Sequence, residues 1–147
     1  MTILLVEDNQ DHAELALRAL QDQEYEAPCQ TFWMKNGQEA LDFLQDEEKG
    51  DRPLPSIIIL DIKLPKVTGI ELLRKIKANR ILSRIPVIML TTSDRSEEME
   101  SCYKLGANSF IVKPVQFSDY IEKVRSVKYY WTRINSSLHL EKYAGEK

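Results

Sequence analysis

The chain has 147 residues, of which 43% are hydrophobic and 29% charged, and this composition fits one domain with a real apolar core. Its formal net charge of -3 gives no overall attraction for nucleic acid, so direct DNA binding is not expected. No apolar stretch approaches the roughly 20 residues that a membrane helix needs, so membrane anchoring is not expected either.

The cysteines and the amino-terminal residues bear on the compartment. Cys29 and Cys102 lack the spacing of metal ligands, and the first residues enter an apolar run without a basic leader. These features predict a reduced, cytoplasmic setting.

Five short apolar runs are predicted to be strands of a buried parallel sheet. They are residues 3–6, 31–34, 57–60, 87–90 and 109–112. Helical periodicity fills the intervals between them: patterns begin after Asp11, Gly37 and Gly69, a fourth helix runs from Ser96 to Lys104, and a fifth begins near Gln116. The charged segment 45–55 is predicted to be a solvated loop. Strands that alternate with helices predict right-handed βαβ units and one doubly wound α/β domain of the (βα)5 type.

Carboxylates follow two of the predicted strands. Asp61 comes directly after residues 57–60, and the pair Glu7 and Asp8 comes after residues 3–6. Asp61 alone fits a turn residue equally well, but parallel strands bring their carboxyl ends to one edge, where ligands bind. Carboxylates gathered there repel one another unless a cation joins them, and Mg²⁺ prefers such oxygen ligands. Thr91 and Lys113, at the ends of the fourth and fifth strands, complete the predicted site, with Lys113 as a charge for a phosphoryl group.

In this combination, residues 2 to about 127 resemble a response-regulator receiver domain. The matching positions are the acidic pair Glu7 and Asp8, the phosphoacceptor Asp61 in Asp-Ile-Lys-Leu-Pro, the switch hydroxyl Thr91, the switch aromatic Phe110 and the pair Lys113-Pro114. The resemblance implies a flavodoxin-like five-stranded sheet in the order 2-1-3-4-5.

The resemblance also implies a function. Asp61 would accept a phosphoryl group from the phosphohistidine of a sensor histidine kinase. Mg²⁺ would be held by Asp8, Asp61 and the backbone carbonyl of Lys63, and Glu7 would contribute through water or outer contacts. The protein would not be a turnover enzyme, although it would catalyse its own phosphorylation and slow dephosphorylation.

Three further expectations concern the same residues. Thr91 would turn toward the phosphoryl group and Phe110 would rotate into the vacated space, although plain packing of Phe110 is the alternative. A cis bond between Lys113 and Pro114 is a family expectation. The cation of Lys63 would pair with the phosphoryl group or obstruct attacking water, which predicts slow hydrolysis.

An apolar stripe continues beyond residue 127. Its members recur at spacings of three and four, which predicts an extended carboxyl-terminal helix: Phe117, Ile121, Val124, Val127, Trp131, Ile134 and Leu138. Because the sheet can cover only about five turns, residues 131–138 would need another cover. We therefore divide the chain into a receiver domain (1–127) and a dimerising extension (128–147), with Trp131, Ile134 and Leu138 at the interface. The seam would use the fourth helix, fifth strand and fifth helix; the alternative is a tail that folds back or frays.

The extension is too short for an output domain, which predicts a single-domain regulator that acts through an unidentified downstream protein. The stretch Val6-Glu-Asp-Asn with Asp11, the long loop before the third strand and Tyr-Tyr-Trp after the fifth helix are similar to stand-alone regulators paired with cyanobacterial phytochromes. A phytochrome-like kinase is thus the expected donor.

Three other functions are alternatives to this assignment. A phosphatase of the haloacid-dehalogenase type needs Asp-x-Asp after the first strand, where this chain has Glu7-Asp8-Asn9. A dinucleotide-binding enzyme needs Gly-x-Gly-x-x-Gly, and the chain has only five glycines. A phosphorylation-independent interaction module with the same fold is the remaining alternative.

Overall fold

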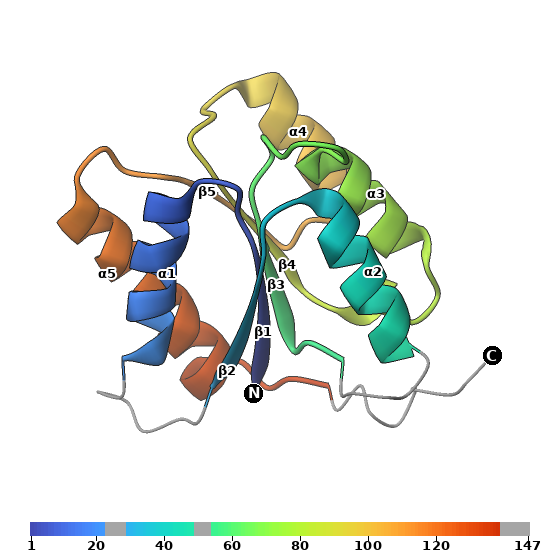
Figure 1. Ribbon diagram of the computed structural model, residues 1–147, viewed down its shortest axis with the longest axis horizontal. Coiled ribbons are helices and arrows are strands. Elements are labelled where there is room, and N and C mark those ends of the chain that lie inside the picture. Colours follow the sequence, from blue (N-terminus) through green and yellow to red (C-terminus); the bar gives the residue numbers. More distant parts are fainter. Residues whose placement is uncertain (23–28, 49–53, 139–147) are drawn as a thin grey trace.

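The computed structural model describes residues 1–22, 29–48 and 54–138. Its strands form one parallel five-stranded sheet in the order β2-β1-β3-β4-β5, which confirms the predicted fold (Figure 1). The strands are β1 (Thr2–Val6), β2 (Gln30–Met34), β3 (Ile57–Leu60), β4 (Val87–Thr91) and β5 (Ser109–Val112). The helices are α1 (Gln10–Gln21), α2 (Gly37–Glu48), α3 (Gly69–Ala78), the 3-10 turn η1 (Leu82–Arg84), α4 (Ser96–Leu105), α5 (Phe117–Tyr129) and the π-helical turn η2 (Tyr130–Ile134).

Helices cover both faces of the sheet. In Figure 1, α1 and α5 lie on one face and α2, α3 and α4 on the other. Alternate residues of each strand point to opposite faces, so two apolar cores form. Ile3, Leu5, Ile57 and Ile59 belong to the core under α1 and α5, whereas Leu4, Val6, Ile58 and Leu60 belong to the core under α2 and α3. The continuous apolar runs of the sequence thus reflect strands buried on both faces.

Local signals fix where the helices begin and end. The Asn9 side chain accepts a hydrogen bond from the His12 N–H at 3.0 Å and caps α1. Thr68 caps α3 in the same way. Gly106 ends α4 in the left-handed region with φ 103°, where a side chain would be strained.

The prediction of a loop over residues 45–55 is wrong for residues 45–48, because α2 continues to Glu48. Gln45 and the acidic residues after it are helix-compatible and extend the helix that Leu41 and Leu44 anchor in the core. Residues 49–53 of that segment lie outside the described ranges.

The carboxyl-terminal stripe differs from prediction in two ways. The helix ends at Ile134 in a π-helical turn, where the Asn135 N–H donates to Tyr130 O at 2.7 Å, so Leu138 is not on a helical face. Trp131 is already covered in part, because it is half-buried against the core under α1 and α5. The wider π turn changes the direction of side chains after Tyr129, and a uniform helical period cannot anticipate this change. Residues 139–147 lie outside the described part, and the division at residue 127 stays a prediction.

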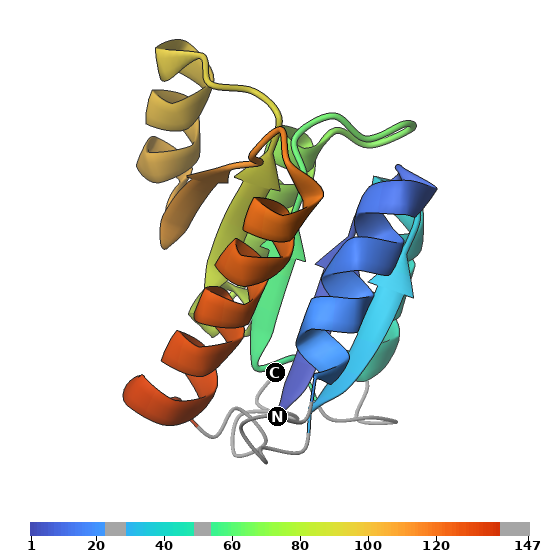
Figure 2. The ribbon, with the colours of Figure 1, turned by 90° about the vertical axis from the view of Figure 1, so that its left-hand side faces the viewer.

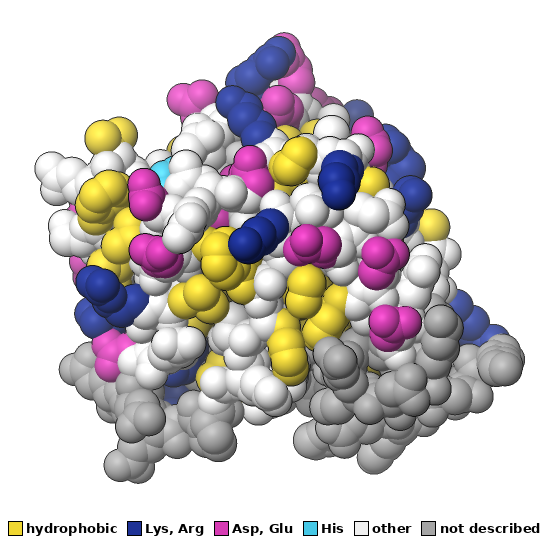
Figure 3. All heavy atoms as spheres, viewed as in Figure 1, with side chains coloured by type: hydrophobic (Ala, Val, Ile, Leu, Met, Phe, Trp, Pro, Cys, Tyr) yellow, Lys and Arg dark blue, Asp and Glu magenta, His cyan; other side chains and the backbone are white. Residues whose placement is uncertain are grey.

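The surface carries mixed charge. On the face drawn in Figure 3, Lys and Arg side chains are interspersed with Asp and Glu side chains. Within the residues that the structure describes, no helix combines the length and the apolar character needed to cross a membrane.

Candidate functional site

The predicted site residues meet at the carboxyl edge of the sheet, at the top of Figure 1. Backbone hydrogen bonds place them there: the Asp61 N–H donates to Val6 O at 3.1 Å, and the Lys113 N–H donates to Thr91 O at 2.7 Å. The ladder that builds the sheet therefore extends one residue past the strands. It fixes the Cα positions from which Asp61 and Lys113 project.

A close approach of backbone to backbone holds the loop behind Asp61. The Gly69 N–H donates to Ile62 O at 2.8 Å. A Cβ at Gly69 would lie 1.9 Å from the Asp61 carbonyl oxygen, so only glycine fits at the start of α3. The packing of Gly69 against Asp61 and Ile62 fixes the main chain at the candidate phosphoacceptor Asp61.

Three carboxylates converge at this edge. One oxygen from each of Glu7, Asp8 and Asp61 lies within 4.8 Å of the others. Glu7 and Asp61 are buried, whereas Asp8 is exposed. The three side chains thus form a negatively charged cluster that is exposed to solvent at Asp8, as predicted from the strand ends.

Lys113 is the cation of the site. Its ammonium donates to Glu7 Oε2 at 2.5 Å and to Asp61 Oδ2 at 2.9 Å. The Lys113 and Glu7 side chains are 2% exposed and that of Asp61 is 7% exposed, so these charge-assisted bonds lie in a dry environment.

The cis bond expected before Pro114 is not found, because the described backbone contains only trans peptide bonds. Lys113 reaches both carboxylates with a trans bond, which is also the intrinsically preferred isomer.

The burial of Glu7 perturbs its ionisation. Desolvation and the nearby Asp61 carboxylate raise the pKa of Glu7 from 4.5 to about 7, and they outweigh the opposing effect of the Lys113 hydrogen bond. One ammonium therefore does not neutralise the two buried carboxylates fully.

Asp61 has one oxygen to spare. Its Oδ2 binds Lys113, whereas its Oδ1 is buried without a hydrogen-bond partner among the residues described. A buried carboxylate oxygen without a partner is costly. An oxygen-seeking divalent cation would satisfy it, so the donor set of Glu7, Asp8 and Asp61 fits such an ion.

The two switch candidates lie on neighbouring strands. Thr91 is fully buried at the end of β4, and its hydroxyl accepts from the Ser93 N–H at 3.3 Å. Phe110 on β5 is half-buried and packs against the core under α2 and α3. Lys63, two residues after Asp61, has an exposed side chain.

Two residues of the site were missed from the sequence. His12 of α1 lies with Nδ1 3.1 Å from Lys113 Nζ, and the Trp33 indole N–H donates to the Glu7 carbonyl oxygen at 2.8 Å. A polar aromatic one turn into the first helix was a usable signal for His12. Nothing in the strand pattern distinguishes Trp33 from a core residue.

A sheet in this order, with an acidic pair, a buried aspartate, a threonine and a lysine at its carboxyl edge, defines the receiver class of signalling proteins. The chain belongs to that family: the model of the response regulator receiver domain matches residues 3–125. The family assignment predicted from the sequence is therefore confirmed, and with it the role of this class in two-component signalling.

Individual relatives agree with the assignment. The chain is 41% identical over 135 residues to the probable methanogenesis regulatory protein FilR2 of Methanothrix harundinacea, covering 92% of this chain and 86% of that protein. It is 34% identical to the response regulator Rcp1 of a Synechocystis strain, covering 88% and 87% of the two chains.

Solved structures are similar over nearly the same length. The phosphorylated cyanobacterial phytochrome response regulator RcpA superimposes with a TM-score of 0.86 at 32% identity, covering 92% of this chain and 96% of that one. The Mn²⁺-bound form of Rcp1 gives the same TM-score and identity, covering 93% and 98%. The predicted similarity to regulators of the phytochrome group is thus confirmed as a similarity.

Proposed function

We propose that the chain is a single-domain response regulator that accepts a phosphoryl group on Asp61 from the phosphohistidine of a sensor kinase. The observation that carries the proposal is the Asp61 carboxylate itself, buried between an acidic pair and an ammonium with one oxygen unpartnered. Membership of the receiver family supports it.

We propose Mg²⁺ as the physiological cation, held by Asp8, Asp61 and the backbone carbonyl of Lys63, with Glu7 beside it. When bound, the ion would screen charge between the carboxylate and the incoming phosphoryl group. That Rcp1 has a Mn²⁺-bound form supports a divalent ion for this chain as well.

Each residue of the site has its own role in the proposed phosphoryl transfer. An Asp61 oxygen attacks phosphorus, the P–O bond forms as the P–N bond to the donor histidine breaks, and the imidazole leaves with the bonding pair. Lys113 exchanges its contact with Asp61 Oδ2 for one with a phosphoryl oxygen. The hydroxyl of Thr91 turns from the Ser93 N–H toward the same group, and Phe110 moves into the space it leaves.

A direct test uses a small phosphodonor. The protein with phosphoramidate and Mg²⁺ should acquire acid-stable, base-labile phosphate, and Asp61→Asn should abolish it, whereas Asp42→Asn, an exposed aspartate on α2, should label as the parent does. Labelling of the Asp61→Asn protein would contradict the proposal. A parent that never labels would favour the phosphorylation-independent module, and steady hydrolysis of a phosphate ester would contradict the expectation that this is no turnover enzyme.

We propose a phytochrome-like histidine kinase as donor, because RcpA is a phytochrome response regulator and matches over nearly its whole length. The free thiols of Cys29 and Cys102 support a cytoplasmic setting. Transfer from a purified phytochrome kinase at least about tenfold faster than from an unrelated sensor kinase would support this donor, and equal rates would contradict it.

We further propose that the chain forms a homodimer through α4, β5, α5 and the turn η2. Figure 2 shows β5 at the free edge of the sheet, between α4 and α5. A groove of about 510 Å³ runs along this edge, lined by apolar residues that include Phe110, Ile111, Val127 and Trp131.

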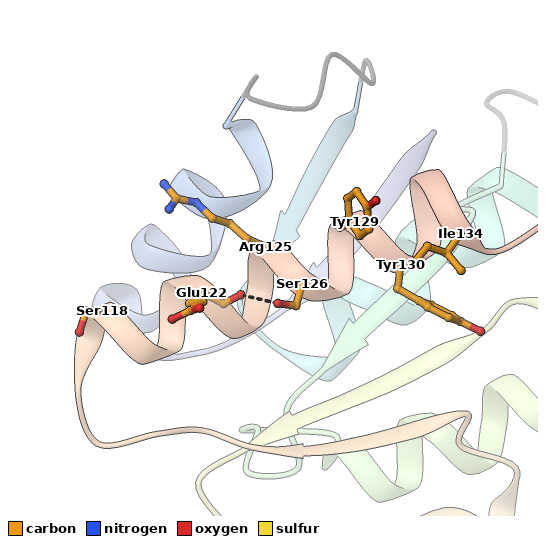
Figure 4. A pocket seen from close by; sticks show the side chains of 7 residues that line it. All are labelled: Ser118, Glu122, Arg125, Ser126, Tyr129, Tyr130 and Ile134. Atoms are coloured by element: carbon orange, nitrogen blue, oxygen red, sulfur yellow. Dashed lines mark hydrogen bonds between the residues drawn. The ribbon is translucent and has the colours of Figure 1, made fainter.

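A second surface pocket, of about 720 Å³, lies on the outer side of α5 (Figure 4). Tyr129, Tyr130 and Ile134 line it and are 42%, 46% and 60% exposed. Aromatic and aliphatic side chains left in water at a free sheet edge favour association. Of the predicted interface, Ile134 and Leu138 are exposed, whereas Trp131 is half-buried and lines the groove.

Ile134→Glu tests the seam without touching the core, because this side chain is 60% exposed. Sedimentation velocity should show a monomer for Ile134→Glu and a dimer for both the parent and Val115→Glu, a control that is 97% exposed on the loop before α5. An unchanged mass for Ile134→Glu would contradict the proposed seam.

A further inference from the structure

The Lys113 ammonium has three protons and three acceptors. Two are the carboxylates of Glu7 and Asp61, and the third is the ring nitrogen Nδ1 of His12 at 3.1 Å. An ammonium only donates, so His12 Nδ1 must accept and the imidazole proton lies on Nε2. His12 therefore belongs to the hydrogen-bonding set of the site, although it stands 101 residues from Lys113 in the chain.

His12 is held both at its backbone and at its ring. Its backbone N–H donates to the Asn9 side chain, which fixes the first turn of α1. The centroid of its ring lies 5.9 Å from the centroid of the Tyr120 ring of α5, with 33° between the two ring planes. Tyr120 is only 2% exposed. Burial and the adjacent ammonium lower the pKa of His12 below its ordinary value, which keeps the acceptor lone pair on Nδ1.

We propose that His12 is a positioning residue for phosphoryl transfer, which holds the Lys113 ammonium over Asp61 before and after the reaction. The inference rests on the proposed function of Asp61. During transfer Lys113 must give up an acceptor to reach a phosphoryl oxygen. The carboxylates of Glu7 and Asp61 are also the groups that would face the divalent metal ion. His12 is the one acceptor of the set that carries no charge and is not a candidate metal ligand, so it can keep its contact throughout.

A neutral acceptor also suits this place physically. A third carboxylate here would add to the repulsion that already raises the pKa of Glu7, and it would compete with the phosphoryl group for the ammonium. The His12 lone pair orients Lys113 without that competition.

Two substitutions of matched shape separate positioning from packing. Asn in His12→Asn places an amide oxygen where Nδ1 lies, whereas Leu in His12→Leu keeps the branching but has no acceptor. With phosphoramidate and Mg²⁺, His12→Leu should label Asp61 about tenfold more slowly than the parent, and His12→Asn should stay within about twofold of it, since a hydrogen bond to a charged group is lost only in the first. Equal rates for the parent and His12→Leu, or equal losses in both variants, would overturn the proposal.

A spectroscopic measurement tests the contact independently of phosphorylation. The chain has two histidines, so the imidazole nitrogens of His12 are identified in a long-range ¹H–¹⁵N spectrum as the signals that His12→Asn removes. They should show the Nε2–H tautomer, with a Nδ1 shift that moves in Lys113→Met. The Nδ1–H tautomer, or a Nδ1 shift indifferent to Lys113→Met, would overturn the proposal. Failure of the proposed function would appear differently, as a parent protein that does not label at Asp61.

Discussion

Replacing Glu7 by glutamine should stabilise the protein in the absence of divalent cations above neutral pH. Glu7 is ionised there although its side chain is 2% exposed and the Asp61 carboxylate lies beside it. Glutamine keeps an oxygen that can accept from Lys113 and removes the negative charge. The amide nitrogen then takes the place of Oε1, which accepts from the Asn9 N–H at 3.1 Å, so the loss of that bond offsets part of the gain.

The size of the effect follows from the shift of the pKa of Glu7 from 4.5 to about 7. At about 1.36 kcal/mol for each tenfold change in acidity, this difference between the folded and unfolded states corresponds to about 3 kcal/mol. Between pH 4.5 and about 7 the folded protein keeps a proton that the unfolded chain releases. The stability of the parent therefore falls as pH rises through this window and levels off above it, while Glu7→Gln lacks this contribution.

Urea unfolding can be followed by far-ultraviolet circular dichroism at several pH values between 5 and 8 in the presence of a chelator. It measures the difference in free energy of unfolding between Glu7→Gln and the parent. The free energy of unfolding of Glu7→Gln should exceed that of the parent by an amount that grows with pH. Added Mg²⁺ should reduce this difference at pH 8, because the parent, with the Glu7 charge beside the ion, binds it more tightly than the variant. Glu14→Gln, an exposed glutamate on α1, should show no such trend. A gap of constant size, or a less stable Glu7→Gln protein at pH 8, would refute the reasoning.

Four other substitutions probe the site and the backbone that frames it. Gly69→Ala places a Cβ 1.9 Å from the Asp61 carbonyl oxygen, so it should cost about 3 kcal/mol in urea unfolding and abolish labelling; unchanged labelling would contradict the close approach. Asn9→Ala and Thr68→Ala each remove a helix cap and should each cost about 1 kcal/mol, but only Asn9→Ala should also slow labelling of Asp61, and equal labelling of the two variants would count against a role for α1. Lys63→Ala should shorten the half-life of the phosphorylated protein if the exposed Lys63 cation shields the phosphate, and an unchanged half-life would exclude that shielding.

The sequence was sufficient where structure follows from local pattern. All five strands were predicted to within a residue at each end, because apolar runs flanked by turn residues have few other readings in an alternating chain. Parallel pairing then brings the residues after each strand together, which is why Asp61 and Lys113 could be assigned to one edge before the sheet was seen.

The remainder depends on contacts distant in the chain or on subtle backbone geometry. No periodicity could show that His12 meets Lys113, since the contact needs α1 and the end of β5 to be placed in space. The π-helical turn breaks the period from which Leu138 was assigned to a helical face. The extension of α2 to Glu48 was missed because charged residues suit exposed helices and loops equally.

The two tryptophans stand at opposite ends of the proposed signalling route. Trp33 donates to the Glu7 carbonyl oxygen at the carboxyl edge of the sheet, while Trp131 lines the groove beside β5. With only two tryptophans in the chain, Trp33→Phe and Trp131→Phe would each leave a single tryptophan, whose emission can be excited apart from that of the tyrosines. Emission from Trp33 would then follow events at the proposed metal site and emission from Trp131 those at the proposed dimer seam, so the order in which the two ends respond could be timed without any added label.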